Sequence, residues 1–221
     1  MLHSMLRAAT RKNYYETVMV DSPVAYWGVD GNSKSASGLY NATDGPMAYF
    51  DGGLALKYAR GRMIYPKITG SVLTLEIWIK HDPSLSGWAD AFAESSNNHA
   101  MIFQNNSSMK MFVGNATGPG PSGGLGGAAK ILDSAWHHYV HVINSATDSL
   151  AGSCDQYVDG VLKNTFSHSL DTTVYGVDRT GNWKSSGDTS GNPLGSWDEP
   201  SIYDFALSPA RIAAHYNAGT T

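Results

Sequence analysis

Hydrophobic and polar residues alternate most clearly in the segment LTLEIWIK, residues 73–80. Successive side chains of a β-strand point to opposite faces of the sheet, so the segment predicts a strand with two different faces. One face is aliphatic and the other is mixed, the two sets being Leu73, Leu75, Ile77 and Ile79, and Thr74, Glu76, Trp78 and Lys80. This pattern indicates a sheet that is covered fully on one side and partly on the other.

Other short segments repeat this alternation and are separated by turn residues. They are HAMIFQ (99–104), MKMFV (109–113) and WHHYVHVIN (136–144), and the hairpins AYFDGGLALKY (48–58) and QYVDGVLKNTF (156–166). The dipeptide Asp159-Gly160 is the strongest kind of local hairpin signal. Polar stretches at 32–47, 81–98, 114–127 and 178–196 are expected loops. Around ten short strands with turns between them predict an all-β sandwich of two antiparallel sheets.

Both ends of the chain carry helical patterns. Residues 1–20 place an apolar stripe on one side of a helix, made by Leu2, Leu6, Ala9, Tyr14 and Val18. This N-terminal helical arm either packs on the sandwich or tethers the chain to a larger assembly. After a short strand at 201–204, Ser208 and Pro209 fit the N-cap and first position of a C-terminal helix, and Gly219 is expected to end it. The predicted organisation is an arm at 1–20 and one domain at 21–221.

Composition supports a single β-rich domain. The chain has 221 residues, of which 42% are hydrophobic and 15% charged, with 24 glycines, a mix that favours short strands and tight turns over a helical protein. The net charge of −4 gives no electrostatic basis for binding nucleic acid or an anionic membrane. Charged residues interrupt the N-terminal segment, and no run approaches the ~20 apolar residues of a membrane span. We therefore expect no leader peptide and no transmembrane segment. The single cysteine, Cys154, cannot form an internal disulfide and is expected to be buried and unreactive.

The C-terminal segment DEPSIYDFALSPARIAAHY (198–216) resembles a known family pattern. It is similar to the "DE-x-x-I-Y-D-x-x-L-S-P-x-x-I-x-x-H-Y" tail of laminin-G-like jelly rolls of the concanavalin A type. Further landmarks of this family are matched in order by PVAYWGVD (23–30), YFDGG (49–53), LTLEIWIK (73–80), WHHYVHV (136–142) and QYVDGVL (156–162). The resemblance covers nearly the whole chain and implies a two-sheet jelly-roll sandwich with a short C-terminal helix.

The resemblance also implies one structural calcium ion. It places the carboxylate ligand at Asp198, near the final strand, and Asp51 in its Asp-Gly turn is an alternative or additional ligand. Calcium takes six to eight oxygen ligands, many of them carbonyls that sequence does not reveal. The alternative role for Asp198 is to hold the loop before the last strand by hydrogen bonds.

The carboxylates do not form the pair that a glycoside hydrolase needs. A retaining enzyme uses two carboxyl groups about 5 Å apart, which on a strand requires acids at even spacing. Glu76 stands alone on its strand, and the adjacent Asp198 and Glu199 would point to opposite faces. We therefore expect no catalytic residue and no enzymatic activity, and we expect Glu76 to be a partly buried acid bonded to backbone or to a neighbouring strand.

Three histidines on one predicted strand suggest a metal site at first sight. His137 and His141 share a face but lie roughly 13 Å apart, too far for one ion, and His138 faces the other way. We therefore expect ordinary strand histidines.

Two predicted loops combine tryptophan with amide or basic side chains, as glycan binding requires. One holds Trp88 with Asn97 and Asn98, and the other holds Trp183 with Arg179 and Asn182. In the alternative reading, each tryptophan ring folds back over an end of the sandwich. Three other tryptophans lie on family-matching strands and are expected in the core: Trp27, Trp78 and Trp136.

The leading functional prediction is a non-catalytic recognition module that binds glycan, such as a host-surface polysaccharide, at its loop rim. The motif "Y-x-x-x-V-x-x-D-S-P-V-A-Y-W" at 14–27 resembles that of accessory proteins of bacteriophage particles. This implies display on a capsid or tail, with residues 1–20 contacting virion proteins. Display in many copies would strengthen binding at weak sites through multivalency. The chain would act as a homo-oligomer or as a monomer. The alternative is a structural decoration protein that makes only protein contacts. A glycoside hydrolase is the remote alternative.

Overall fold

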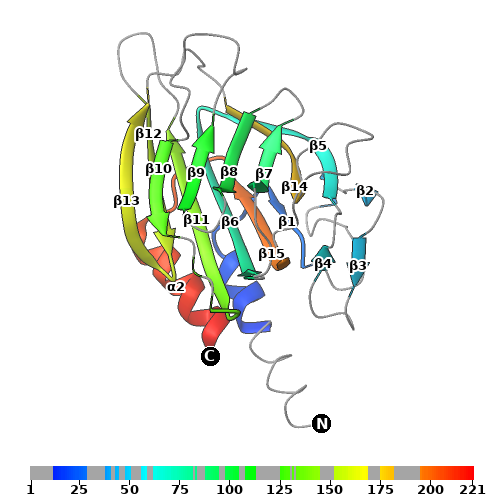
Figure 1. Ribbon diagram of the computed structural model, residues 1–221. Helices are drawn as coiled ribbons and strands as arrows, with labels where there is room; N and C mark the ends of the chain where they lie inside the picture. Colours follow the sequence, from blue (N-terminus) through cyan, green and yellow to red (C-terminus); the bar gives the residue numbers. More distant parts are fainter. Residues whose placement is uncertain are drawn as a thin grey trace.

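The computed structural model describes residues 12–28, 38–40, 43–44, 48–50, 56–58, 62–81, 83, 88–94, 98–104, 108–112, 125–129, 131, 133–144, 152–168, 175–181 and 195–221. These residues form two antiparallel sheets stacked as a sandwich, with helices at the two ends of the chain (Figure 1). The prediction of a two-sheet antiparallel sandwich is confirmed.

Within the described residues, one sheet has eight strands in the order β13-β12-β11-β6-β15-β4-β3, with β1 also pairing with β15. Its strands are β1 (Ala25–Tyr26), β3 (Ala48–Phe50), β4 (Leu56–Tyr58), β6 (Val72–His81), β11 (Trp136–Asn144), β12 (Gly152–Val158), β13 (Val161–His168) and β15 (Gly195–Tyr203). The other sheet has seven described strands in the order β10-β9-β8-β7-β14-β5-β2. They are β2 (Thr43–Asp44), β5 (Arg62–Gly70), β7 (Trp88–Glu94), β8 (Asn98–Gln104), β9 (Ser108–Phe112), β10 (Leu125–Ala129) and β14 (Tyr175–Gly181).

The loops expected from the sequence are shorter than predicted. The stretch 81–98 contains β7, the stretch 114–127 runs into β10, and the stretch 178–196 is bounded by the end of β14 and the start of β15. Glycine, serine and asparagine in these stretches hide the strand signal, because their β-propensity is low. Pairing with neighbouring strands overrides this local preference.

The main core lies between the two sheets. The aliphatic face of β6 packs there against residues of the other sheet such as Met63, Phe92 and Phe103. Trp27 and Trp197 are also fully buried in this core. The expectation that Trp27 lies in the core is confirmed. Trp197, for which we made no prediction from the sequence, lies in the same core.

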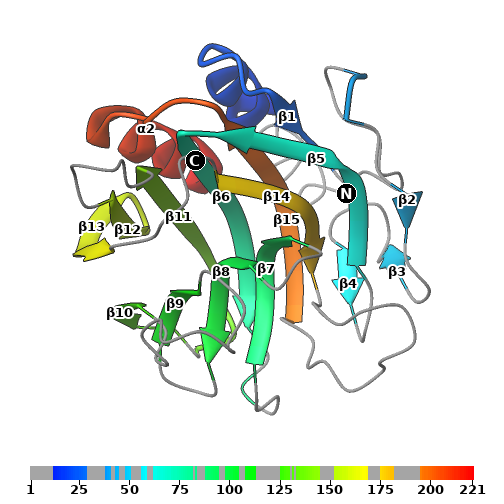
Figure 2. The ribbon, with the colours of Figure 1, turned by 90° about the horizontal axis from the view of Figure 1, so that it is seen from above.

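A second core lies on the outer face of the eight-stranded sheet. Trp78 of β6 packs there with Val140 and Val142 of β11 and with Tyr14 and Val18, which belong to a helix at residues 12–19. Figure 2 shows that this helix and the C-terminal helix α2 (Pro209–Thr220) lie on the same side of the sheet. The second face of β6 is therefore covered more completely than the alternation predicts, since seven consecutive residues, Leu73–Ile79, are buried. The arm packs on the sandwich over the part that is described, and residues 1–11 lie outside it.

Helix α2 begins as predicted and ends differently. The Ser208 hydroxyl accepts a hydrogen bond from the Arg211 amide, and Pro209 occupies the first turn. The expected helix stop at Gly219 is wrong, because α2 continues to Thr220. A Cβ atom at Gly219 would lie 2.3 Å from the ring of Trp78. The glycine therefore allows α2 to lie close to the Trp78 ring.

Candidate functional site

Three of the residues predicted to bind glycan are described, and they fall on the adjacent strands β8, β7 and β14 of the seven-stranded sheet. Trp88 is the first residue of β7 and pairs with Gln104, whereas Asn98 is the first residue of β8 and pairs with Glu94. Trp88 and Glu94 are six residues apart on one strand, roughly 20 Å. Trp88 and Asn98 therefore lie at opposite ends of the β7–β8 hairpin, so the expectation that one loop brings them together is wrong. Their side chains, and the positions of Asn97, Asn182 and Trp183, lie outside the described part of the structure.

Arg179 lies in β14 rather than in the loop where the sequence analysis places it. Its register partners are Ile64 of β5 and Ala93 of β7. Its neighbour Thr180 faces the inner core, where the Thr180 hydroxyl lies 3.2 Å from the hydroxyl of Tyr65. Because side chains alternate along a strand, Arg179 faces the outer side of the sheet. It is nevertheless only 8% exposed.

The outer side of this sheet carries two ion pairs, whose members we call the charged strip: Lys67, Glu94, Asp178 and Arg179. The Arg179 Nε donates to an Asp178 oxygen at 2.7 Å. The Lys67 ammonium pairs with Glu94, and its side chain runs over Gly176 of β14. Because Arg179 pairs in register with Ala93, the residue before Glu94, the two ion pairs lie on neighbouring positions of β14 and β7.

The charged strip combines donors and acceptors in a form that suits sugar hydroxyls. The guanidinium group offers a planar set of donors and the two carboxylates offer acceptors. Sequence reasoning identified Arg179 but missed Lys67 and Glu94, which are 27 residues apart and have no shared local motif. Their proximity comes from the order β7-β14-β5 in the sheet, which local sequence patterns do not reveal.

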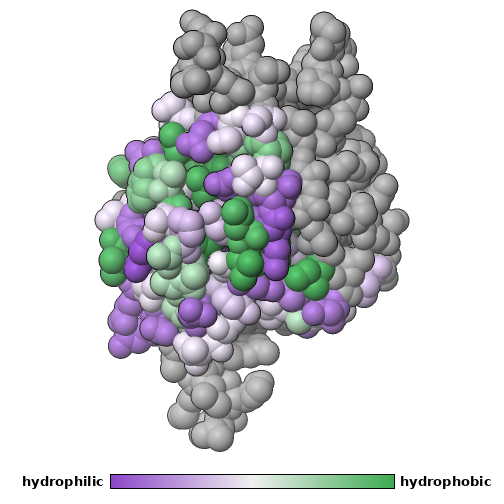
Figure 3. Space-filling model, turned by 90° about the vertical axis from the view of Figure 1, so that its left-hand side faces the viewer, coloured by the Kyte–Doolittle hydropathy of each residue, from purple (hydrophilic) through white to green (hydrophobic). Residues whose placement is uncertain are grey.

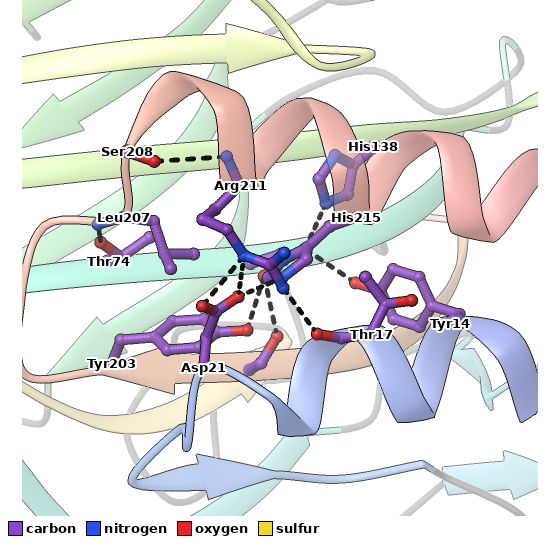
Figure 4. A network of polar contacts seen from close by, with 12 residues as sticks. Tyr14, Thr17, Asp21, Thr74, His138, Tyr203, Leu207, Ser208, Arg211 and His215 are labelled. Carbon is purple, nitrogen blue, oxygen red and sulfur yellow. Dashed lines mark hydrogen bonds and ion pairs between the residues drawn. The ribbon is translucent and has the colours of Figure 1, made fainter.

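Glu76 lies on β6 of the opposite sheet, at the centre of a buried polar network to which both helices contribute. Figure 4 labels its partners Tyr14, His138, Tyr203 and His215. The Glu76 carboxylate accepts hydrogen bonds from the hydroxyls of Tyr14 at 2.8 Å and Tyr203 at 3.0 Å. His138 Nε2 lies at 2.6 Å and His215 Nδ1 at 3.0 Å from the same carboxylate. Glu76 is thus fully rather than partly buried, and its partners include side chains from both helices.

The electrostatics of the network keep Glu76 ionised. Burial alone would raise the pKa of Glu76, but attraction to His215 and His138 and the hydrogen bonds from both rings hold it well below its ordinary value of 4.5. Burial and the charge of Glu76 raise the pKa of Tyr14 well above 10, so its hydroxyl stays a donor. A carboxylate this buried and this strongly ionised has neither the access nor the proton that a general acid needs.

The three histidines of β11 have different partners. His137 bridges Asp159 at 2.7 Å and Asp133 at 2.9 Å, and His138 bonds to Glu76. His141 lies 2.8 Å from the carbonyl oxygen of Ala100 on the other sheet. No group of three or more histidine, cysteine, aspartate or glutamate side chains in the described ranges is arranged to hold a metal ion.

Asp198 lies within β15, because the last strand begins six residues earlier than predicted, at Gly195 rather than Ser201. Its carboxylate accepts the backbone amide of Glu199 at 3.0 Å. Glu199 has a positive φ of 54°, the register shifts between Asp198 and Ser201, and the Glu199 carboxylate accepts the hydroxyl of Tyr26. This bulge breaks the strict alternation on which we based the opposite orientation of the two acids. The other expected calcium ligand, Asp51, lies outside the described residues, and calcium binding stays a prediction.

The side of the molecule that carries β13 and α2 offers no comparable site in its described residues. Val161 and Leu162 are exposed on β13. Figure 3 shows hydrophobic side chains mixed with hydrophilic ones on this side rather than gathered in one area. Neither described helix has the length and apolar composition to cross a membrane.

One family model matches the chain over residues 62–213, which is more than half of its length. The model, Laminin_G_3, is described as the concanavalin A-like lectin/glucanases superfamily. A search of curated proteins finds no match.

Solved structures with the same fold come from several sugar-binding proteins. Domain 4 of AbnA, a GH43 extracellular arabinanase from Geobacillus stearothermophilus solved with arabinotriose, is 18% identical with a TM-score of 0.60, and the match covers 88% of this chain and 98% of that domain. Trypanosoma rangeli sialidase with sialic acid is 14% identical with a TM-score of 0.62, over 97% of this chain but 38% of the sialidase. The ligand-binding domain of botulinum neurotoxin serotype D with N-acetylneuraminic acid is 15% identical with a TM-score of 0.56, over 89% of this chain and 51% of that one. At these identities, the matches show the shared fold.

Proposed function

Because this chain belongs to the concanavalin A-like lectin/glucanases superfamily, we propose that it is a non-catalytic module that binds glycan on the outer side of its seven-stranded sheet. The observation that carries this proposal is the charged strip, since it pairs donors with acceptors on the outer side of a sheet on which no described helix packs. Lys67, whose side chain is 48% exposed, is its most accessible member, and Arg179 and Glu94 lie mostly buried behind it. On the eight-stranded sheet, both described helices pack on the outer face over β6 and β11. Solved relatives of the same fold bind arabinotriose and N-acetylneuraminic acid, which supports a sugar ligand here.

The arrangement of acids supports a binding role over hydrolysis. Glu76 is buried beneath two helices and bonded to several donors. The two carboxylates of the charged strip are each already paired with a cation, Glu94 with Lys67 and Asp178 with Arg179. A glycosidase needs one carboxyl group to stay protonated, and neither place favours this. The glycoside hydrolase reading is therefore the weaker one.

We further propose that the module is displayed on a bacteriophage particle, where many copies bind a host polysaccharide. The motif at 14–27 that suggested this has structural roles of its own, since Tyr14 contacts Glu76 and Trp27 lies in the core. Because residues 12–19 pack on the sheet, contacts with virion proteins would fall to other residues, among them 1–11. No part of this proposal depends on calcium.

The proposal is tested by glycan array followed by calorimetric titration with the polysaccharides that score. Replacing Arg179 or Lys67 of the charged strip by alanine should weaken binding about tenfold or more, as expected for central contact residues. Lys163→Ala and Phe205→Ala remove an exposed cation and an exposed ring elsewhere and should leave the affinity unchanged. Circular dichroism must show that each variant is folded.

Three outcomes would contradict the proposal. Absence of binding to any glycan, with association to particles retained, would favour the structural decoration protein. Equal losses in the control variants would remove the charged strip as the site. Release of reducing sugar that disappears in a folded Glu94→Gln or Asp178→Asn variant would make the protein a hydrolase.

A further inference from the structure

His215 of α2 lies between two carboxylates in the buried network. Its Nδ1 is 3.0 Å from a Glu76 oxygen, and its Nε2 is 2.8 Å from an Asp21 oxygen. An ionised carboxylate only accepts hydrogen bonds, and a neutral imidazole has one N–H group. Both contacts are hydrogen bonds only when both ring nitrogens carry protons. The geometry therefore fits an imidazolium at His215, although its ring is fully buried.

The N-terminal helix is attached to the sandwich through the same charges. Asp21, two residues after this helix, also accepts the Nε of Arg211 at 2.7 Å, and the Arg211 guanidinium donates to the carbonyl oxygen of Thr17 at 3.0 Å. The Tyr14 hydroxyl donates to Glu76. These contacts join the helix, α2 and β6 around His215, as Figure 4 shows.

We propose that the N-terminal helix is a proton-controlled clasp: loss of the proton from His215 releases residues 12–21 from the sheet while the sandwich stays folded. A neutral His215 turns a lone pair toward either Asp21 or Glu76, so one of its two attachments is lost. The apolar contacts of the helix are made by Tyr14, Val18 and Met19 on the second core and by the ring of Tyr15 beside Tyr26. None of these residues belongs to the core between the sheets, so that core remains intact after release.

Each element that packs around His215 contributes a charged or titratable group. These groups are Tyr14 of the N-terminal helix, Asp21 after it, Glu76 of β6, His138 of β11, Tyr203 of β15 and Arg211 of α2 itself. Burial by itself lowers the pKa of His215, but the charge and hydrogen bonds of Glu76 and Asp21 outweigh it and raise the pKa above its ordinary value of 6.5. Asp21 leaves with the helix whereas Glu76 stays, so the part of the raised pKa that comes from Asp21 is linked to docking. Docking is therefore strongest below the pKa of His215 in the released state and weakens as the pH rises through its pKa in the docked state, by up to tenfold per pH unit.

The clasp is tested on the full chain by hydrogen exchange between about pH 5.5 and about pH 9, with rates normalised for intrinsic exchange. Amide protection of residues 13–20 should fall as the pH rises, while amides of β6 and β11 keep theirs. The ring-nitrogen shifts of His215 in NMR spectra should show the doubly protonated form at the low end. Asp21→Asn should move the transition about one pH unit lower, because one carboxylate no longer favours the imidazolium.

The matched control is Asp133→Asn, which removes a carboxylate from His137 instead and should not move the transition. His215→Gln should abolish the pH dependence if Asp21→Asn does not fold. Protection of residues 13–20 that is constant with pH, or that is lost together with that of β6, would overturn the proposal. So would an unchanged transition in folded Asp21→Asn.

Discussion

Replacing Glu76 by glutamine is the sharpest perturbation of the network that holds both helices. The Glu76 side chain is 1% exposed. It accepts hydrogen bonds from Tyr14 and Tyr203 and from the rings of His138 and His215. Glutamine keeps the shape but removes the charge, so the imidazolium of His215 faces an amide. Removing one partner of a buried ion pair costs about 3–5 kcal/mol. We expect a loss of this size in the free energy of unfolding.

The assay is urea denaturation followed by circular dichroism and tryptophan fluorescence at about pH 6. A thermal melt gives a second measure. For a chain of this length, 1 kcal/mol shifts Tm by about 2–4 °C, so the Tm of Glu76→Gln should lie about 10 °C below that of the parent protein. The matched control is Glu16→Gln, whose side chain is 62% exposed and lies 3.8 Å from Lys12; a change below about 0.5 kcal/mol is expected. If Glu76→Gln lies within about 1 kcal/mol of the parent, the network does not stabilise the fold as argued.

Three further predictions concern α2 and the pH dependence of stability. Gly219→Ala should destabilise the protein by about 1–3 kcal/mol in urea denaturation, because its Cβ would overlap the Trp78 ring; unchanged stability would mean that the ring moves away freely. Ser208→Ala should cost about 1 kcal/mol, since the cap on the Arg211 amide is lost, whereas Ser208→Asp should retain most of the stability. Burial lowers the pKa of His141 to about 4, so its contribution is present above pH 6.5 and is lost as the pH falls toward 4. His141→Gln should therefore flatten the acid side of the curve of Tm against pH, and an unchanged acid side would refute this assignment.

Sequence patterns predicted those elements that are determined by residues close together in the chain. The alternation in β6 identified its inner face, Ser208 and Pro209 marked the start of α2, and the turn at Asp159-Gly160 has the positive φ angles, 53° and 73°, of a tight hairpin. Each of these depends on residues a few positions apart. Their physical causes are therefore visible in the sequence.

The rest depends on contacts between distant segments. Glu76 is 62 residues from His138 and 139 from His215, and no spacing rule joins them. Gly219 is a residue type that commonly ends a helix, but α2 continues past it. A glycine is required there because a Cβ atom would overlap the ring of Trp78 in the second core. Arg179 was assigned to a loop because its neighbours are polar, although pairing with β5 and β7 places it within a strand.

The start of the N-terminal helix and the last residue of the chain lie next to each other, since the Asn13 side-chain amide donates to the Thr221 hydroxyl at 3.3 Å. If residues 1–11 are removed, a linker of a few residues would therefore join the start of the N-terminal helix to Thr221 without moving either helix. Circular permutants with new ends in an exposed turn should then be obtainable. A reporter fused after Thr221 would sit beside the entry to the N-terminal helix, on the side of the sandwich away from the charged strip.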